Sequence, residues 1–207
     1  MQIKICGLTD PEEAGYAASL GANYIGILFS SYSKRCVPLN RAKEIAQAAH
    51  LNGALAVGVF VDETADQIRS LCEQAEIQVI QLHGKRSQQD AVGLYRDYPL
   101  IFYAVPVGFD GHLDQPHDLP ACAYPLYDHL SGGTGQTFEW KAFTPPKNKP
   151  WMLAGGLNPH NVGSAIRLLQ PSGVDVASGV EYPQSVRKNP LLVKAFIEAV
   201  KEAKEKK

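Results

Sequence analysis

The hydrophobic residues of the chain gather in eight short runs, which are separated by longer stretches with a helical pattern. The runs are rich in Ile, Val, Leu and Tyr, and they lack the alternation that marks a strand with one exposed face. Nearly continuous apolar runs are typical of parallel strands that are buried on both faces. We therefore predict eight strands, at residues 3–6, 24–29, 56–61, 79–82, 101–105, 124–127, 152–154 and 174–177.

The segments between the runs carry helix signals. Asp10 is followed by a proline and two glutamates, which combine an N-cap, a first-turn proline and an acidic first turn. Asn158 and the proline after it repeat this signal, and apolar residues recur at helical spacing over 68–72 and 161–169. The stretch 108–120 is rich in Asp, Gly, Pro and His, and we expect the weakest helix there.

The spacing of the runs predicts the fold. Their C-terminal ends lie about 24 residues apart, and eight strand–helix units at this pitch fit an α/β protein of the closed (β/α)8 TIM barrel type. A doubly wound sheet usually has about five or six strands and a Gly-rich fingerprint after the first strand, which residues 1–8 lack. No linker, charge block or low-complexity segment divides residues 1–207, so we expect a single domain.

Composition and charge exclude several classes of protein. The net charge is −1, with 20 basic and 21 acidic residues, so neither nucleic acid nor an anionic membrane is favoured as a partner. No apolar run approaches the roughly 18 residues that span a bilayer, and no leader precedes the first strand, which predicts a cytoplasmic protein. The cysteines form no C-x-x-C pair and have no histidine at ligand spacing, which predicts reduced thiols and no metal site. We expect structural roles for Cys36, Cys72 and Cys122.

Candidate catalytic residues end two of the predicted strands, where the chemistry of such barrels is located. Cys6 ends the first strand and is either a small buried apolar residue or a reactive thiolate. We expect Lys4 to point away from it, so that any cation that acidifies the thiol comes from another loop. Asp128 ends the sixth strand, in an apolar setting that raises a carboxyl pKa and suits a general acid, unless it caps the loop 131–135. The two side chains are expected to face each other across the barrel mouth.

Binding residues are expected in four other loops. Gly155, Gly156 and Asn158 follow the seventh strand, and Ser178 and Gly179 follow the eighth. Each loop alone fits a tight turn, but together they favour a phosphate site. Other polar residues follow the second and fourth strands. Arg35 has the geometry to grip a carboxylate, and Gln81 and His83 share one strand face, where they line the pocket or are satisfied by neighbours.

Seven motifs extend this set in order along the chain. They are K-I-C-G-L-T at 4–9, S-K-R at 33–35, V-G-V-F-V at 57–61, Q-L-H-G at 81–84, G-G-T-G-Q-T-F-E-W at 132–140, A-G-G-L-N-P at 154–159 and V-D-V-A-S-G-V-E at 174–181. Together they resemble the phosphoribosylanthranilate isomerase family of tryptophan biosynthesis, the first and fifth motifs most specifically. The resemblance implies an Amadori rearrangement of a small molecule, N-(5'-phosphoribosyl)anthranilate, without cofactor or metal. The implied product is 1-(2-carboxyphenylamino)-1-deoxyribulose 5-phosphate.

The resemblance also implies roles for individual residues. It makes Cys6 the general base and Asp128 the general acid, and it assigns Arg35 to the anthranilate carboxylate. The implied phosphate site is Gly155, Gly156, Ser178 and Gly179, and the substrate-binding set is completed by Gln81, His83, Asn158 and Asp175. Two residues depart from the usual pattern. His129 replaces a small residue, with an expected effect on the pKa of the acid, and Cys36 replaces an aromatic one, with an expected effect on the packing of the anthranilate loop.

Two other functions compete with this one. Another phosphosugar isomerase or epimerase, or indole-glycerol-phosphate synthase, usually uses a metal or a Lys/Glu pair, and Lys4 is the only lysine within a predicted strand. A non-catalytic barrel that binds a phosphoribosyl ligand has no need of both Cys6 and Asp128. The apolar helix residues cannot be divided between core and interface, so a monomer is the working expectation and the oligomeric state stays open.

Overall fold

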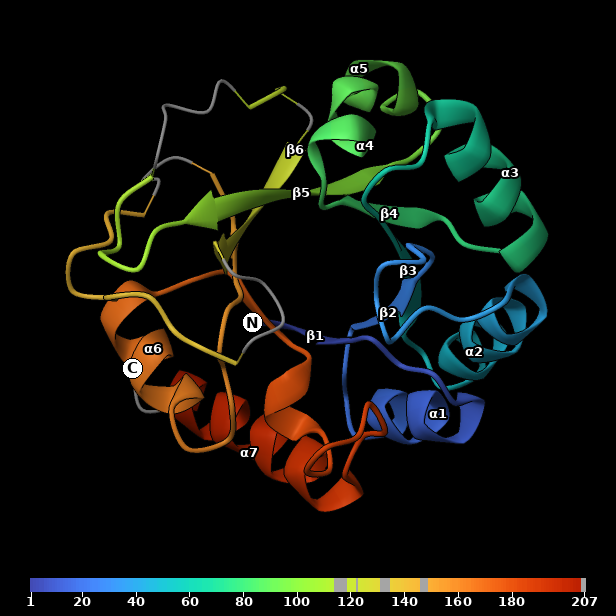
Figure 1. Cartoon of the computed structure of the whole chain (residues 1–207). Coiled ribbons are helices and arrows are strands. Elements are labelled where there is room, and N and C mark those ends of the chain that lie inside the picture. The colour runs from blue at the N-terminus through green and yellow to red at the C-terminus, as the bar shows by residue number, and fades with distance from the viewer. Residues whose placement is uncertain (114–118, 122, 131–134, 146–148, 206–207) are drawn as a thin grey trace.

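The computed structural model describes residues 1–113, 119–121, 123–130, 135–145 and 149–205. Eight parallel strands follow one another around a closed barrel in sequence order, and the last pairs with the first (Figure 1). The predicted barrel is therefore confirmed, and each predicted strand agrees with an observed one to within about two residues at either end. The strands are β1 Gln2–Cys6, β2 Tyr24–Leu28, β3 Leu55–Phe60, β4 Val79–Leu82, β5 Leu100–Val107, β6 Ala123–His129, β7 Met152–Leu153 and β8 Gly173–Val176.

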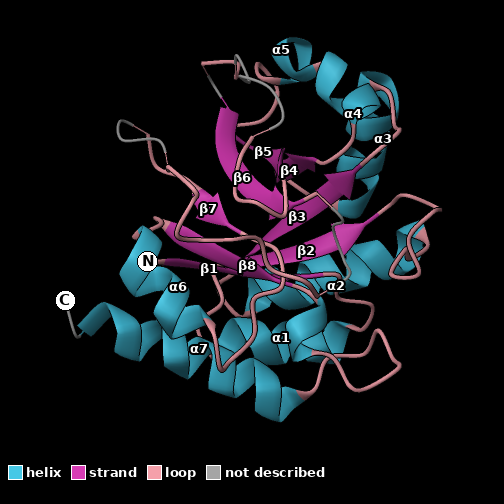
Figure 2. Cartoon of the chain, turned by 60° about the vertical axis from the view of Figure 1, so that its left-hand side comes forward, coloured by secondary structure: helices cyan, strands magenta, loops and turns pink. Residues whose placement is uncertain are grey.

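Helices cover most of the outside of the barrel (Figures 1 and 2). They are α1 Pro11–Ser19, α2 Leu39–Leu51, α3 Ala65–Ala75, α4 Lys85–Gln89, α5 Ala91–Leu94, α6 Val162–Leu169 and α7 Pro190–Glu205, with a short 3-10 helix, η1, at Ser178–Val180. Within the described residues the ring is open between α5 and α6, where loops follow β5 and β6 (Figure 1). Of the expected weak helix at 108–120, residues 114–118 lie outside the described part, and 108–113 contain a turn at Gly111, whose φ is +81°.

The helix starts depend on local caps. Asp10 Oδ1 accepts hydrogen bonds from the backbone N–H groups of Glu12 and Glu13, so α1 begins where the sequence predicts. The prediction at Asn158 was wrong by several residues, since α6 begins at Val162. The Asn158 side chain accepts hydrogen bonds from the two backbone N–H groups at positions 160 and 161, which forms a turn ahead of the helix.

Strand alternation separates two packed layers. Ile3 and Ile5 point outward into the layer between the strands and the helices, whereas Lys4 and Cys6 point into the barrel. The lower part of the interior is filled by an apolar cluster, which consists of Tyr24, Val57, Val79, Phe102, Leu126, Met152 and Ala154. Polar groups are therefore concentrated above this cluster, toward the C-terminal ends of the strands. No helix within the described ranges is both long and apolar enough to cross a membrane.

Candidate active site at the C-terminal mouth of the barrel

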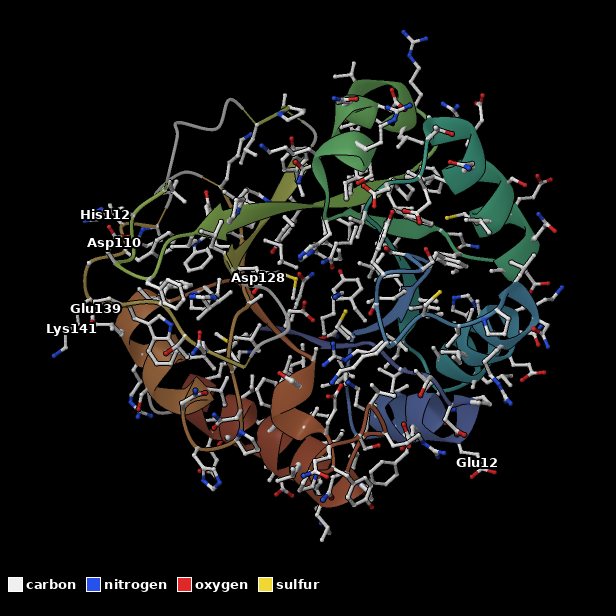
Figure 3. All side chains as sticks on the ribbon, viewed as in Figure 1. Glu12, Asp110, His112, Asp128, Glu139 and Lys141 are labelled. Carbon is white, nitrogen blue, oxygen red and sulfur yellow. The ribbon has the colours of Figure 1, made fainter. Side chains whose placement is uncertain are left out.

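Two adjoining hollows lie at the C-terminal mouth of the barrel. The larger, of about 180 Å³, is lined by Cys6, Arg35, Gln81, His83, Asp128 and Asp175 among others. The smaller, of about 50 Å³, is lined by both glycine loops and shares Asp128 and Asp175 with the first. Asp128 lies near the centre of the ring in Figure 3, whereas Glu12 lies on its outer rim. A larger surface hollow, of about 560 Å³, borders α1 and α7 and is lined in part by Lys188.

Cys6 is held in a dry, charged setting. Burial raises the pKa of its thiol, and Lys4 acts in the opposite direction. The prediction that Lys4 points away from Cys6 was wrong, because residues two apart on a strand share one face. The Lys4 side chain is fully buried, and its Nζ lies 3.0 Å from both carboxylate oxygens of Asp175 on β8. The acidifying cation therefore comes from the same strand as the thiol.

Asp128 is recessed in the mouth, with 17% of its side chain exposed. Burial raises its carboxyl pKa, as the sequence predicts, and the nearby Asp175 adds to the effect. The His83 ring and a hydrogen bond from the His129 backbone N–H act in the opposite direction. The predicted alternative, a cap for the loop 131–135, falls largely on residues outside the described part.

Gln81 and His83 both line the larger hollow, as one of the two predicted alternatives required. The Gln81 side-chain nitrogen lies 3.0 Å from His83 Nδ1, and His83 Nε2 lies 3.7 Å from Asp128 Oδ2. The ring is therefore held between Gln81 and Asp128, with its Nε2 edge toward the carboxyl group.

Arg35 already holds a carboxylate within the chain. Its Nε and Nη2 donate to the two carboxylate oxygens of Glu181 at 2.7 and 3.0 Å, and Lys188 Nζ donates to the same carboxylate at 2.8 Å. Below the guanidinium, Gly7 has a φ of +73°, and a Cβ there would come within 2.5 Å of Arg35 Cδ. The side chain is thus clamped, and a second carboxylate has only the edge that Glu181 leaves free.

The two glycine loops approach each other closely. A Cβ on Gly179 would lie 1.9 Å from the carbonyl oxygen of Leu157 in the other loop. Gly155 instead lies against β6, where a Cβ would come within 2.7 Å of the backbone nitrogen of His129. Gly155, Gly156 and Ser178 line the smaller hollow, as a phosphate site requires, whereas Gly179 is needed for packing between the loops. Asn158 lines an outer hollow beside Gly156 and shapes the turn before α6.

Comparison with known proteins assigns the chain to a family. The model of the family described as N-(5'phosphoribosyl)anthranilate (PRA) isomerase matches residues 3–199. The chain belongs to this family. The N-(5'-phosphoribosyl)anthranilate isomerase of Chlamydia caviae is 52% identical over 206 residues and is matched over 100% of both chains.

Solved structures of phosphoribosylanthranilate isomerases share the fold. The crystal structure of the Thermus thermophilus enzyme is 30% identical, with a TM-score of 0.84, and the match covers 98% of this chain and 99% of that one. Another isomerase structure contains reduced 1-(o-carboxyphenylamino)-1-deoxyribulose 5-phosphate. It is 28% identical, with a TM-score of 0.77 and the same coverage.

The two departures from the usual isomerase pattern lie at the edge of the site. The ring of His129 is buried and packs edge to face against Phe109, with 4.2 Å between the ring centres, while its backbone N–H bonds to Asp128. Cys36 is exposed, and its Sγ lies 3.2 Å from the Phe29 carbonyl oxygen. His129 therefore acts on the Asp128 carboxyl group through its backbone N–H.

Sequence reasoning missed the partners of Arg35 and Lys4. Glu181 lies in a quoted motif but has no assigned role there, and nothing local distinguishes Lys188 from a solvated lysine. For Lys4, the alternation of side chains along β1 was enough to place it on the same inward face as Cys6, although it does not identify Asp175 as the partner. Among the described residues of this isomerase, no group of three or more His, Cys, Asp or Glu side chains is placed to hold a metal ion.

Proposed function

We propose that the chain catalyses the Amadori rearrangement of N-(5'-phosphoribosyl)anthranilate, with Asp128 as general acid and Cys6 as general base. One observation carries this proposal. A thiol and a carboxyl group from different strands line the same hollow, next to a second hollow that is edged by two glycine loops. The chemistry needs an acid and a base on the sugar, with the phosphate held at one side.

The reaction divides between the two groups. Asp128 donates a proton to the ribose ring oxygen as the bond from that oxygen to C1′ breaks, which leaves a protonated Schiff base. The Cys6 thiolate then removes the proton from C2′, and the electron pair of that C–H bond neutralises the iminium to give an enolamine. The enolamine takes up a proton at C1′ and loses one from the C2′ hydroxyl group, which gives the aminoketose.

We assign both anionic ends of the substrate to groups that line the mouth. Glu181 occupies Nε and Nη2 of Arg35, so Nη1 is the group that we assign to the anthranilate carboxylate. Gly155, Gly156 and Ser178 provide the surface for the phosphate. Lys188, which is also paired with Glu181, adds a second positive charge beside the carboxylate end.

The test is direct. Phosphoribosylanthranilate is fluorescent, and when it is generated in the cuvette the purified protein should remove its fluorescence at micromolar concentration without added metal. If the protein binds the substrate and leaves the fluorescence unchanged, the chain is a non-catalytic barrel for a phosphoribosyl ligand and this proposal is wrong.

We also infer a cytoplasmic location and a monomeric state. The thiols of Cys6, Cys36 and Cys72 are free, as a reducing compartment would keep them. The most exposed large apolar side chains, Tyr32, Leu51, Val92 and Leu191, are scattered over different elements, which supports a monomer. Cell fractionation and analytical ultracentrifugation test the two inferences.

A further inference from the structure

A buried ion pair adjoins the two groups assigned to catalysis. The Lys4 side chain is fully buried and that of Asp175 is 8% exposed, and the two residues are register partners on β1 and β8. Removing two charges from water is costly, and an ion pair that serves stability alone is often replaceable by apolar residues. The steps described above give this pair no role.

The two charges of the ion pair act mainly on different catalytic groups. Lys4 shares a strand face with Cys6, and its positive charge lowers the proton affinity of the thiol. Asp175 lines both hollows together with Asp128. The proton affinity of Cys6 is affected more by Lys4 than by Asp175, and that of Asp128 more by Asp175 than by Lys4. The positive end of the pair therefore acts on the base, and the negative end acts on the acid.

We propose that Lys4 and Asp175 are positioning residues that act through both catalytic groups, with the ammonium stabilising the Cys6 thiolate and the carboxylate stabilising protonated Asp128. This inference rests on the proposed function of the site. The reaction needs a deprotonated thiol, the weaker acid, together with a protonated carboxyl, the stronger acid. The population of that form increases as the pKa values of Cys6 and Asp128 approach each other. Lys4 lowers the first value and Asp175 raises the second, so the ion pair brings the two closer.

The other charged groups around the site are separate from this pair. Arg35 and Lys188, on the loops after β2 and β8, act on Cys6, and His83, on β4, acts on Asp128 together with the His129 backbone N–H. A change at positions 4 and 175 leaves all of them in place. Its effect on proton affinity can therefore be assigned to the pair.

The experiment replaces both charges at once, in Lys4→Met/Asp175→Asn, so that no unpaired charge is left buried. The first measurement is the pH dependence of iodoacetamide alkylation of Cys6, followed on its own peptide by mass spectrometry so that the other cysteines do not contribute. We expect the midpoint to rise by about one pH unit or more. The second measurement is the pH profile of kcat/KM, which should fall about tenfold or more at its plateau and widen on both sides.

The widening of the pH profile distinguishes an effect on proton affinity from a purely structural effect of the pair. A variant with a merely distorted site has a lower profile whose two limbs stay in place. If the two limbs of the pH profile and the alkylation midpoint stay unchanged in a folded variant, the inference is wrong.

Lys4→Gln/Asp175→Asn, which removes both charges but keeps polar side chains at both positions, provides a second test if the first double variant does not fold. Its acid limb should move to lower pH. The matched control is the exposed pair that joins Arg69 on α3 to Asp97 in the turn after α5, changed in Arg69→Met/Asp97→Asn. The alkylation measurement needs no substrate, so it still tests the inference if the substrate is not consumed.

Discussion

Burial acts on both catalytic candidates in the same direction, but with opposite consequences. It raises the pKa of Asp128, which favours the protonated carboxyl group that a general acid requires. It also raises the pKa of Cys6, which disfavours the thiolate that a general base requires. The cations around the thiol, above all Lys4, offset part of that cost.

Removing either group should affect turnover much more than binding. We expect Cys6→Ser and Asp128→Asn each to lower kcat by about 10² to 10⁴, with KM little changed, since each removes one proton transfer. Steady-state kinetics on phosphoribosylanthranilate measure both constants. Near-normal turnover in either variant would contradict its assignment.

Glu181 should matter for binding, because it orients Arg35. In Glu181→Gln the guanidinium loses a charged partner that holds two of its nitrogens. We expect KM to rise about tenfold while kcat stays nearly constant, the cost of about one charge-assisted hydrogen bond. Glu44→Gln, in an exposed pair with Arg41 on α2, is the control. An unchanged KM at position 181 would show that Arg35 keeps its orientation without this partner.

At the scale of elements, apolar runs and helix caps predict the barrel well, since each depends on residues that are near in sequence. Thr64 illustrates this, because its side chain and that of Gln67 form a reciprocal capping box at the start of α3. The ion pairs of the site are different. The contacts Lys4–Asp175 and Arg35–Glu181 join residues 171 and 146 positions apart, and only the closed barrel brings them together.

The Thr64 cap provides a test of local stability. Thr64→Ala removes the acceptor for the Gln67 N–H and should lower the free energy of unfolding by about 1 kcal/mol. Kinetic constants should be unchanged, because the cap lies outside the mouth. Urea unfolding measures the loss, with Glu73→Ala on the exposed side of α3 for comparison. Equal stabilities of the two variants would contradict the role of the cap.

For the whole molecule, the acid at the mouth costs stability at neutral pH. A carboxyl whose pKa is higher in the folded chain than in the unfolded chain favours folding less as pH rises above its ordinary value of 3.8. Asp128→Asn removes this cost. The melting temperature of the variant should therefore exceed that of the parent at pH 7, and the difference should shrink toward pH 4.

Thermal unfolding at several pH values measures this difference. His83 Nε2 lies 3.7 Å from Asp128 Oδ2 and acts on the proton affinity of that carboxyl group, so His83→Gln, with and without the change at 128, is the control. A variant that is less stable than its parent at pH 7 would contradict the sign of the effect.

The contact between β1 and β8 also concerns how the chain folds. Until β8 pairs with β1, Lys4 has no carboxylate beside it and cannot enter the dry interior as a cation without a large cost. Closure of the barrel and neutralisation of this lysine are therefore one event, which joins the first strand to the last across nearly the whole chain. The rate at which the Cys6 thiol reacts with an alkylating reagent should therefore change during refolding at the step in which β8 pairs with β1. Its time course would report when the barrel closes.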